Sequence, residues 1–239
     1  MSRRLIGVGV GPGDPELLTL KAHRVLREAD VVLVPETGGT RRAETIVTQA
    51  CPEAVGHLRR VPFSMADRTG VTGRRAAAWQ AAADAAVEAF ETGATTVAFA
   101  TIGDPSVYST FSYLAATVQQ RLPDVTVEVV PGITAMQALA AASTTPLVEG
   151  DEVLALVPLK TTERLGDITP VADTVVVYKS GRHFGELADH LASLGRDGIV
   201  GIDIGLPGEK IAPIADVTEA PYMCTVLSVP TRSGIGARL

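Results

Sequence analysis

The centre of the chain reads Val97-Ala98-Phe99-Ala100-Thr101-Ile102-Gly103-Asp104-Pro105-Ser106-Val107-Tyr108-Ser109-Thr110-Phe111. It begins as a short apolar run typical of a β-strand, turns at Gly103-Asp104-Pro105 and continues in a pattern compatible with a helix. Open α/β sheets bind ligands at the carboxyl ends of parallel strands, so we expect a binding site at this turn. The simpler interpretation is a well-capped helix, with Asp104 or Ser106 as N-cap and Pro105 in the first turn.

The composition limits the class of protein. Hydrophobic residues make up 46% of the 239 residues but aromatic residues only 4%, so small aliphatic side chains must fill the core. That mixture suits an α/β protein with one large or two medium domains. The 21 Lys and Arg against 27 Asp and Glu give a net charge of −6, which argues against a nucleic-acid or anionic membrane partner. A local basic pocket remains compatible with this charge.

The cysteines and the amino terminus indicate the compartment. Cys51 and Cys224 show neither a Cys-x-x-Cys nor a Cys/His spacing, so we expect no disulfide framework and no metal site. The sequence shows no signal-peptide pattern and no uninterrupted apolar run approaching roughly 20 residues. We therefore expect a soluble, cytoplasmic protein without a membrane partner.

The amino-terminal residues predict a βαβ unit. A strand over 4–10, the turn Gly11-Pro12-Gly13-Asp14-Pro15, an amphipathic helix over 16–29 and a strand over 30–34 follow one another. The glycines do not form a G-x-G-x-x-G, Pro12 interrupts the turn, and the chain has no P-loop lysine motif. The P-loop site for nucleoside triphosphates is therefore excluded, and the pattern argues against a nicotinamide dinucleotide site.

A second strand, turn and helix follow over 125–142, with Thr134 at the expected helix start. We expect this turn and the central one to face one crevice. Thr145-Pro146-Leu147 predicts a domain junction, which gives an α/β domain over 1–146 and another over 147–239. The second domain should contain strands over 153–157, 174–178 and 198–204, and an edge or antiparallel strand over 222–229.

Three sequence blocks in order carry a resemblance to a known family. They are Gly7-Val8-Gly9-Val10-Gly11-Pro12-Gly13-Asp14-Pro15-Glu16-Leu17-Leu18-Thr19-Leu20-Lys21, Gly103-Asp104-Pro105 and Val130-Pro131-Gly132-Ile133-Thr134-Ala135. Together they resemble the S-adenosylmethionine-dependent tetrapyrrole methylases of corrin and sirohaem synthesis, over nearly the whole chain. Residues 103–113, Thr145-Pro146-Leu147 with Asp151-Glu152, and Ala220-Pro221-Tyr222 resemble the branch that methylates C-20 of precorrin-2 or cobalt-factor II in cobalamin biosynthesis.

The resemblance implies two α/β domains of the tetrapyrrole methylase type, with the cofactor in the interdomain cleft, and a homodimer. The implied cofactor contacts are Pro12, Ile102, Gly103, Asp104, Val107, Thr134, Ala135, Lys179 and Gly205. Lys179 departs from the apolar residue frequent in relatives, so we expect it to contribute its backbone or to face the substrate. The first turn lies toward the tetrapyrrole in the family, which assigns Gly11 and Asp14 to the substrate.

S-adenosylmethionine needs an acceptor for its ammonium group and N–H donors for its carboxylate, and Asp104 and the helix-start amides match these needs. Methyl transfer is an in-line displacement that depends on alignment, so no catalytic triad is required. The catalytic residue stays unknown, with Tyr108 as a candidate for orienting a reactant or, alternatively, as a tyrosine packed on the core. His23, His57, His183 and His190 are scattered and expected to be surface or hydrogen-bonded histidines.

A tetrapyrrole carries several carboxylates, so basic groups should line its site. We select Arg41 and Arg74 for this role, from a loop set that also contains Arg42, Arg68, Arg75, Lys160 and Arg182. Each of these is alternatively an ordinary surface cation. Two other functions stay open: methylation of another corrin position or of uroporphyrinogen III, and action of a same-fold S-adenosylmethionine-binding protein on a protein substrate.

Overall fold

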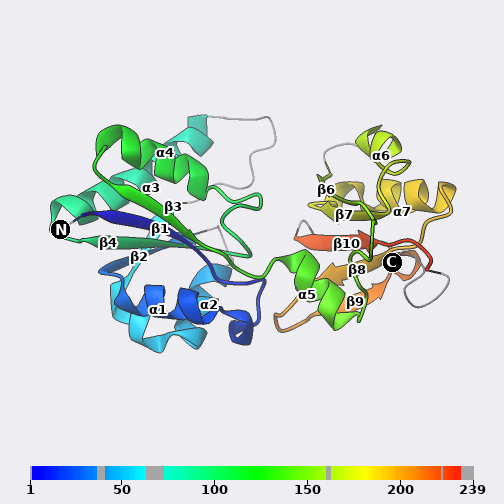
Figure 1. The fold of residues 1–239 in the computed structure, drawn as a ribbon, viewed down its shortest axis with the longest axis horizontal. Helices are drawn as coiled ribbons and strands as arrows, with labels where there is room; N and C mark the ends of the chain where they lie inside the picture. Colours follow the sequence, from blue (N-terminus) through cyan, green and yellow to red (C-terminus); the bar gives the residue numbers. More distant parts are fainter. Residues whose placement is uncertain (1, 37–40, 63–72, 160–162, 222, 233–239) are drawn as a thin grey trace. The chain divides into compact units, whose positions relative to one another are not determined.

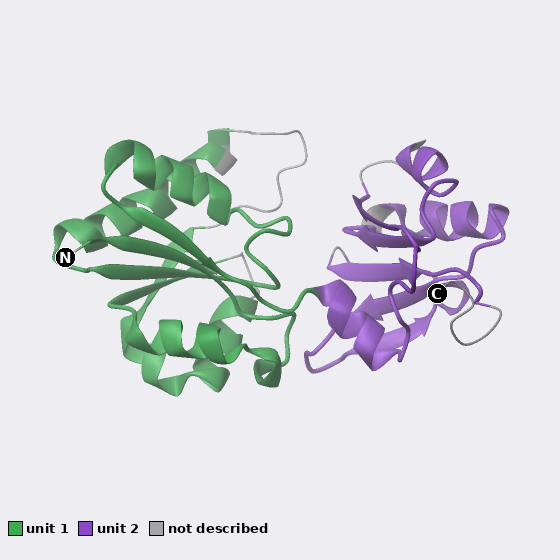
Figure 2. Ribbon diagram, viewed as in Figure 1, with its two compact units in different colours: residues 1–134 green, residues 135–239 purple. Residues whose placement is uncertain are grey.

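The computed structural model describes residues 2–36, 41–62, 73–159, 163–221 and 223–232 (Figure 1). The chain forms two compact units, Met1–Thr134 and Ala135–Leu239 (Figure 2). The division falls before helix α5 (Ala135–Ala142), because α5 packs against strand β10 (Cys224–Ser228) of the second unit. The sequence-based division at 146/147 places this helix in the first domain.

The first unit contains a parallel sheet of five strands in the order β3-β2-β4-β1-β5. The strands are β1 (Arg4–Gly9), β2 (Val31–Glu36), β3 (Leu58–Pro62), β4 (Thr96–Thr101) and β5 (Thr126–Val130). The crossover helices are α1 (Leu20–Glu28), α2 (Arg42–Ala50), α3 (Gly73–Glu91) and α4 (Phe111–Arg121), with 3-10 turns η1 (Pro15–Leu17) and η2 (Pro52–His57).

Helices cover both faces of this sheet, with α1 and α2 on one face and α3 and α4 on the other (Figure 1). The alternation of side chains along each strand explains why both faces are apolar. In β4, Ala98 and Ala100 pack with α1 and α2, whereas Val97 and Phe99 pack with α3 and α4.

Two helix starts differ from the sequence prediction. Helix α4 begins at Phe111 rather than directly after Gly103-Asp104-Pro105, because residues 104–110 form an irregular turn. Helix α1 begins at Leu20, where the Thr19 hydroxyl accepts a hydrogen bond from the Ala22 amide at 3.1 Å. The preceding residues form η1 instead. In both places the sequence is compatible with a longer helix, but the observed helix begins only after its N-cap residue.

The second unit contains a mixed sheet in the order β6-β7-β10-β8-β9. The strands are β6 (Leu154–Pro158), β7 (Thr174–Tyr178), β8 (Ile199–Ile202), β9 (Lys210–Pro213) and β10. Helices α5, α6 (Glu163–Ile168) and α7 (Phe184–Ser193), with 3-10 turns η3 (Gly181–His183) and η4 (Ile214–Asp216), complete the unit. The predicted α/β class is thus confirmed, with two sheets.

Strand β10 is antiparallel to both of its neighbours, as one of the two sequence-based alternatives has it. The other alternative, an edge strand, is wrong. All five residues of β10 are buried, because β7 and β8 flank the strand. In the ranges that the structure describes, no helix is both long and apolar enough to cross a membrane.

Candidate functional site

The carboxyl ends of three adjacent strands build the candidate site of the first unit. Strands β4, β1 and β5 are parallel neighbours, so the turns that follow them lie at one edge of the sheet. These turns contain residues 11–14, 102–107 and 132–134. The structure therefore brings together the sequence-predicted residues of these three turns, with β1 lying between β4 and β5.

Glycines allow these turns to touch backbone to backbone. Gly11 and Gly103 form an antiparallel bridge, in which the Gly103 amide donates to the Gly11 carbonyl at 2.8 Å. A Cβ on Gly132 would lie 2.2 Å from the Gly103 carbonyl oxygen, and one on Gly9 would lie 2.6 Å from the same oxygen. We call Gly9, Gly11, Gly103 and Gly132 the glycine junction, because any side chain at 9 or 132 would separate the three turns.

Asp104 fastens the junction from one side. Its carboxylate accepts hydrogen bonds from the Ser106 amide at 2.7 Å, from the Ser106 hydroxyl, and from the Gly132 amide at 2.9 Å. Burial by itself raises the pKa of Asp104, but these hydrogen bonds outweigh burial and hold the pKa below its ordinary value. Asp104 is therefore an ionised, buried residue that ties the turn after β4 to the turn after β5.

The space beside Gly103 is open. Among the residues that the structure describes, a Cβ at this position would meet only the Cα of Thr134 within a 4 Å radius, at 4.0 Å. Gly103 has a φ of 69°, which favours glycine. Ile102 and Val107 beside it are half-buried, and Thr134 is buried. The junction thus leaves space beside the Cα of Gly103 next to apolar side chains, an arrangement suited to the apolar part of a ligand.

The turn from 104 to 110 is not the capped helix start of the simpler interpretation. Tyr108 has a φ of 51° and a side chain that is 43% exposed, so it is not packed wholly in the core. Partial burial raises the pKa of Tyr108. The Ser109 hydroxyl contacts the Thr101 hydroxyl at 3.1 Å and accepts a bond from the Phe111 amide at 3.2 Å. Ser109 thereby joins strand β4 to the start of α4.

The residues predicted to contact the substrate lie in different elements, and some lie outside the described residues. Asp14 caps η1, with its carboxylate accepting from the Glu16 amide at 2.8 Å. Arg41 is exposed at the start of α2, with its guanidinium 4.0 Å from the carboxylate of Glu36. Arg42 is half-buried in α2. Arg68, Lys160 and the side chains of Arg74, Arg75 and Arg182 lie outside the described part of the structure.

In the second unit, Lys179 follows β7 and Gly205 lies just beyond β8. Both strands run antiparallel to β10, so both residues lie at the same edge of the second sheet. Their φ values are 63° and 74°, and the Gly205 amide donates to a Glu209 carboxylate oxygen at 2.7 Å. Asp203, which the sequence did not single out, also has a positive φ of 49° at this edge. No sequence pattern distinguishes a lysine or aspartate in this conformation.

A buried pair accompanies Lys179. The Ser180 hydroxyl contacts the Cys224 sulfur at 2.9 Å, and both side chains are buried. Burial raises the pKa of the Cys224 thiol, so this cysteine is a neutral packing residue. Cys51 and Cys224 are both free thiols.

Comparison with known proteins gives consistent matches. The family model described as Tetrapyrrole (Corrin/Porphyrin) Methylases matches residues 4–220. A precorrin-2 C(20)-methyltransferase from Sinorhizobium sp. is 34% identical over 238 residues, which is 94% of this chain and 94% of that protein. A probable cobalt-precorrin-2 C(20)-methyltransferase from Methanocaldococcus jannaschii is 36% identical, covering 74% of this chain and 73% of the relative.

The similarity extends to solved structures. The uroporphyrin-III C-methyltransferase from Thermus thermophilus, solved with S-adenosylhomocysteine, superposes with a TM-score of 0.64 and 26% identity. The match covers 94% of this chain and 96% of that chain.

Proposed function

We propose the reaction of this chain from one premise: it belongs to the tetrapyrrole (corrin/porphyrin) methylases. The family uses S-adenosylmethionine, so the chain is an S-adenosylmethionine-dependent tetrapyrrole C-methyltransferase. Within that class, we propose that it methylates C-20 of precorrin-2 or its cobalt form in cobalamin biosynthesis. The C(20)-methyltransferases of Sinorhizobium sp. and Methanocaldococcus jannaschii, at 34% and 36% identity, support this choice.

The open space beside Gly103 is the observation that carries the cofactor assignment. S-adenosylmethionine needs hydrogen-bonding groups for its amino-acid end and an apolar surface for adenine. The open space beside the Cα of Gly103, with half-buried Ile102 and Val107 next to it, fits the apolar part of the cofactor in the first unit, whereas the Gly103 amide already donates to the Gly11 carbonyl. When bound, S-adenosylmethionine supplies a methyl group on a positively charged sulfur.

We propose a different role for Asp104 from the direct ammonium contact expected from the sequence. Its two carboxylate oxygens already accept hydrogen bonds from Ser106 and Gly132, although a carboxylate has capacity for about four. Its main task is then to hold the turns after β4 and β5 at a fixed separation. Alignment of the two reactants is what a displacement at carbon requires, so a rigid junction serves the reaction directly.

The remaining assignments stay predictions. Pro12, Ala135, Lys179 and Gly205 are proposed as further cofactor contacts, and Gly11, Asp14, Arg41 and Arg74 as substrate contacts. Tyr108 is a candidate for orienting a reactant, because its side chain is partly exposed on the turn that follows β4. The homodimer implied by the family also stays a prediction.

The activity test uses purified protein, S-adenosylmethionine and precorrin-2 made in situ without oxygen. One added methyl at C-20, identified by mass and by NMR, is the expected result. A methyl at another position, or on uroporphyrinogen III, would assign the chain to a different reaction of the same family. Binding of S-adenosylhomocysteine without turnover of any tetrapyrrole would favour a protein substrate.

A matched pair of variants tests the cofactor site. Gly103→Ala fills the open space, whereas Gly195→Ala adds the same methyl at a φ of 65° where no atom of the described residues lies within 4 Å. Both substitutions strain the backbone equally, by about 1–2 kcal/mol. Calorimetry should show weaker S-adenosylhomocysteine binding for Gly103→Ala alone. Equal affinities in the two variants would contradict a cofactor contact at Gly103.

A further inference from the structure

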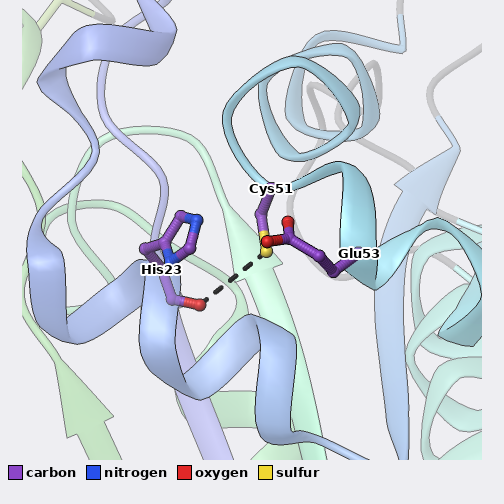
Figure 3. Close-up of side chains that lie close together, drawn as sticks. All are labelled: His23, Cys51 and Glu53. Carbon is purple, nitrogen blue, oxygen red and sulfur yellow. Dashed lines mark hydrogen bonds between the residues drawn. The ribbon is translucent and has the colours of Figure 1, made fainter.

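A second cluster of reactive side chains lies in the helical layer of the first unit, formed by His23, Cys51 and Glu53 (Figure 3). His23 is in the first turns of α1, Cys51 directly follows α2, and Glu53 is in η2. One nitrogen, one sulfur and one oxygen of these side chains lie within 4.8 Å of one another. None of the three residues belongs to the turns of the glycine junction.

Packing fixes one of the three side chains, that of Cys51. Cys51 has no exposed surface and packs in the core with residues that include Ala22 and Ala54. Its thiol donates to the carbonyl oxygen of His23 at 3.8 Å, which joins segments 28 residues apart. His23 is half-buried and Glu53 is exposed. The cluster therefore has a fixed inner side, made by Cys51, and an outer side open to solvent.

We propose that His23, Cys51 and Glu53 bind a divalent cation of borderline softness, with Zn²⁺ as the representative ion. Imidazole nitrogen, thiolate sulfur and carboxylate oxygen are the three ligand types that Zn²⁺ takes in proteins. Three protein ligands with solvent at the fourth position make a complete tetrahedral set. The exposed side of the cluster, at Glu53, supplies that position and a route for the ion.

The required adjustment is small. Metal–ligand bonds of about 2.0–2.3 Å in a tetrahedron place neighbouring ligand atoms roughly 3.3–3.6 Å apart. The present 4.8 Å limit therefore has to shrink by about 1.2–1.5 Å, which rotation of the half-buried His23 and exposed Glu53 side chains supplies without moving Cys51. Arg27 is a nearby cation whose positive charge favours the ionised forms of Cys51 and Glu53. Its guanidinium lies 3.3 Å from the Glu28 carboxylate.

The sequence predicted no metal site because the ligands do not follow one another in a known spacing. His23 lies in α1 and Cys51 lies between α2 and η2, and the packing of α1 against η2 brings them together. The proposal is independent of the methyltransferase assignment, since it uses a different part of the first unit. Its test therefore measures metal binding and not enzyme activity.

The experiment titrates the reduced, full-length protein with Co²⁺ and then displaces Co²⁺ with Zn²⁺. We expect one equivalent of Co²⁺ to produce a thiolate-to-cobalt charge-transfer band together with the visible bands of a tetrahedral ion. Zn²⁺ should abolish both sets of bands. Absence of the charge-transfer band at one equivalent would overturn the proposal.

Matched variants assign the ligands. Cys51→Ser should remove the charge-transfer band, and His23→Gln and Glu53→Gln should each weaken Zn²⁺ affinity by about tenfold or more. The controls Cys224→Ser, His57→Gln and Glu91→Gln change the same residue types elsewhere and should leave both readouts unchanged. Glu53 is exposed, so Glu53→Gln keeps the fold and makes the test independent of core damage at Cys51. Wild-type affinity in both Glu53→Gln and His23→Gln would refute the three-ligand site.

Discussion

Gly132→Ala tests whether the glycine junction is as tight as its geometry indicates. The added Cβ would lie 2.2 Å from the Gly103 carbonyl oxygen and 2.8 Å from the Cα of Gly9, and both are backbone atoms. Comfortable contact needs roughly 3.5 Å, so the turn after β5 would have to move by about 1.3 Å. A flexible side chain cannot absorb this displacement, because the neighbours are main chain.

The displacement lowers the free energy of unfolding in two ways. Overpacking of a tight contact costs about 3 kcal/mol. The same movement stretches the hydrogen bond from the Gly132 amide to the Asp104 carboxylate, now 2.9 Å, and bonds to charged groups contribute about 1.5–3 kcal/mol. We expect a loss of about 5 kcal/mol, which lowers the melting temperature by roughly 10–20 °C for a chain of this size.

Thermal and urea unfolding followed by circular dichroism measure the loss. Gly56→Ala is the control, since no atom in the described part of the chain would lie within 4 Å of its Cβ, and the change in unfolding free energy should stay within about 0.5 kcal/mol. Affinity for S-adenosylhomocysteine should fall in Gly132→Ala and not in the control. A Gly132→Ala protein that melts within about 2 °C of the wild type would refute the reasoning.

Three further predictions concern charged groups. The lowered pKa of Asp104 means that its carboxylate stabilises the fold above the unfolded pKa of about 3.9, and that this contribution is lost as the pH falls through the folded value. Asp104→Asn should therefore lower the free energy of unfolding by about 2 kcal/mol at pH 7. The variant should also lose less stability than the wild type when the pH falls below about 4. Equal free energies of urea unfolding for the two proteins across this pH range would contradict the prediction. Glu152 has a fully buried side chain 2.7 Å from Arg232, so Glu152→Gln should lower the free energy of unfolding by about 3 kcal/mol. The control Asp84→Asn changes an exposed ion pair and should lower it by less than about 1 kcal/mol. Equal losses of stability in the two variants would contradict the prediction. Lys179→Gly keeps the left-handed backbone at this position, so we expect the S-adenosylhomocysteine affinity measured by calorimetry to stay within about twofold of the wild-type value. The kcat/KM for the tetrapyrrole should fall by about fivefold, which corresponds to roughly 1 kcal/mol. A large loss of S-adenosylhomocysteine affinity with an unchanged kcat/KM would assign the side chain to the cofactor.

The site was predictable where its signals are local. Apolar runs that end in glycine turns gave β1, β4 and β5, and the turns after these strands lie at one edge because the strands are parallel. The turn motifs also selected Gly103 and Thr134 as candidates. The role of Asp104 was not predictable, because its partner Gly132 is 28 residues away and reaches it only through the order of strands in the sheet.

The sequence by itself determined the α/β class, the strand-turn-helix units and the family, since each depends on residues close together along the chain. The tertiary structure alone decided which turns touch, that β10 lies inside its sheet, and that His23 meets Cys51. The physical reason is that these contacts join residues 28 or more positions apart or depend on strand order. Local propensity carries no information about such pairs, and only the packing of helices and strands into one core selects them.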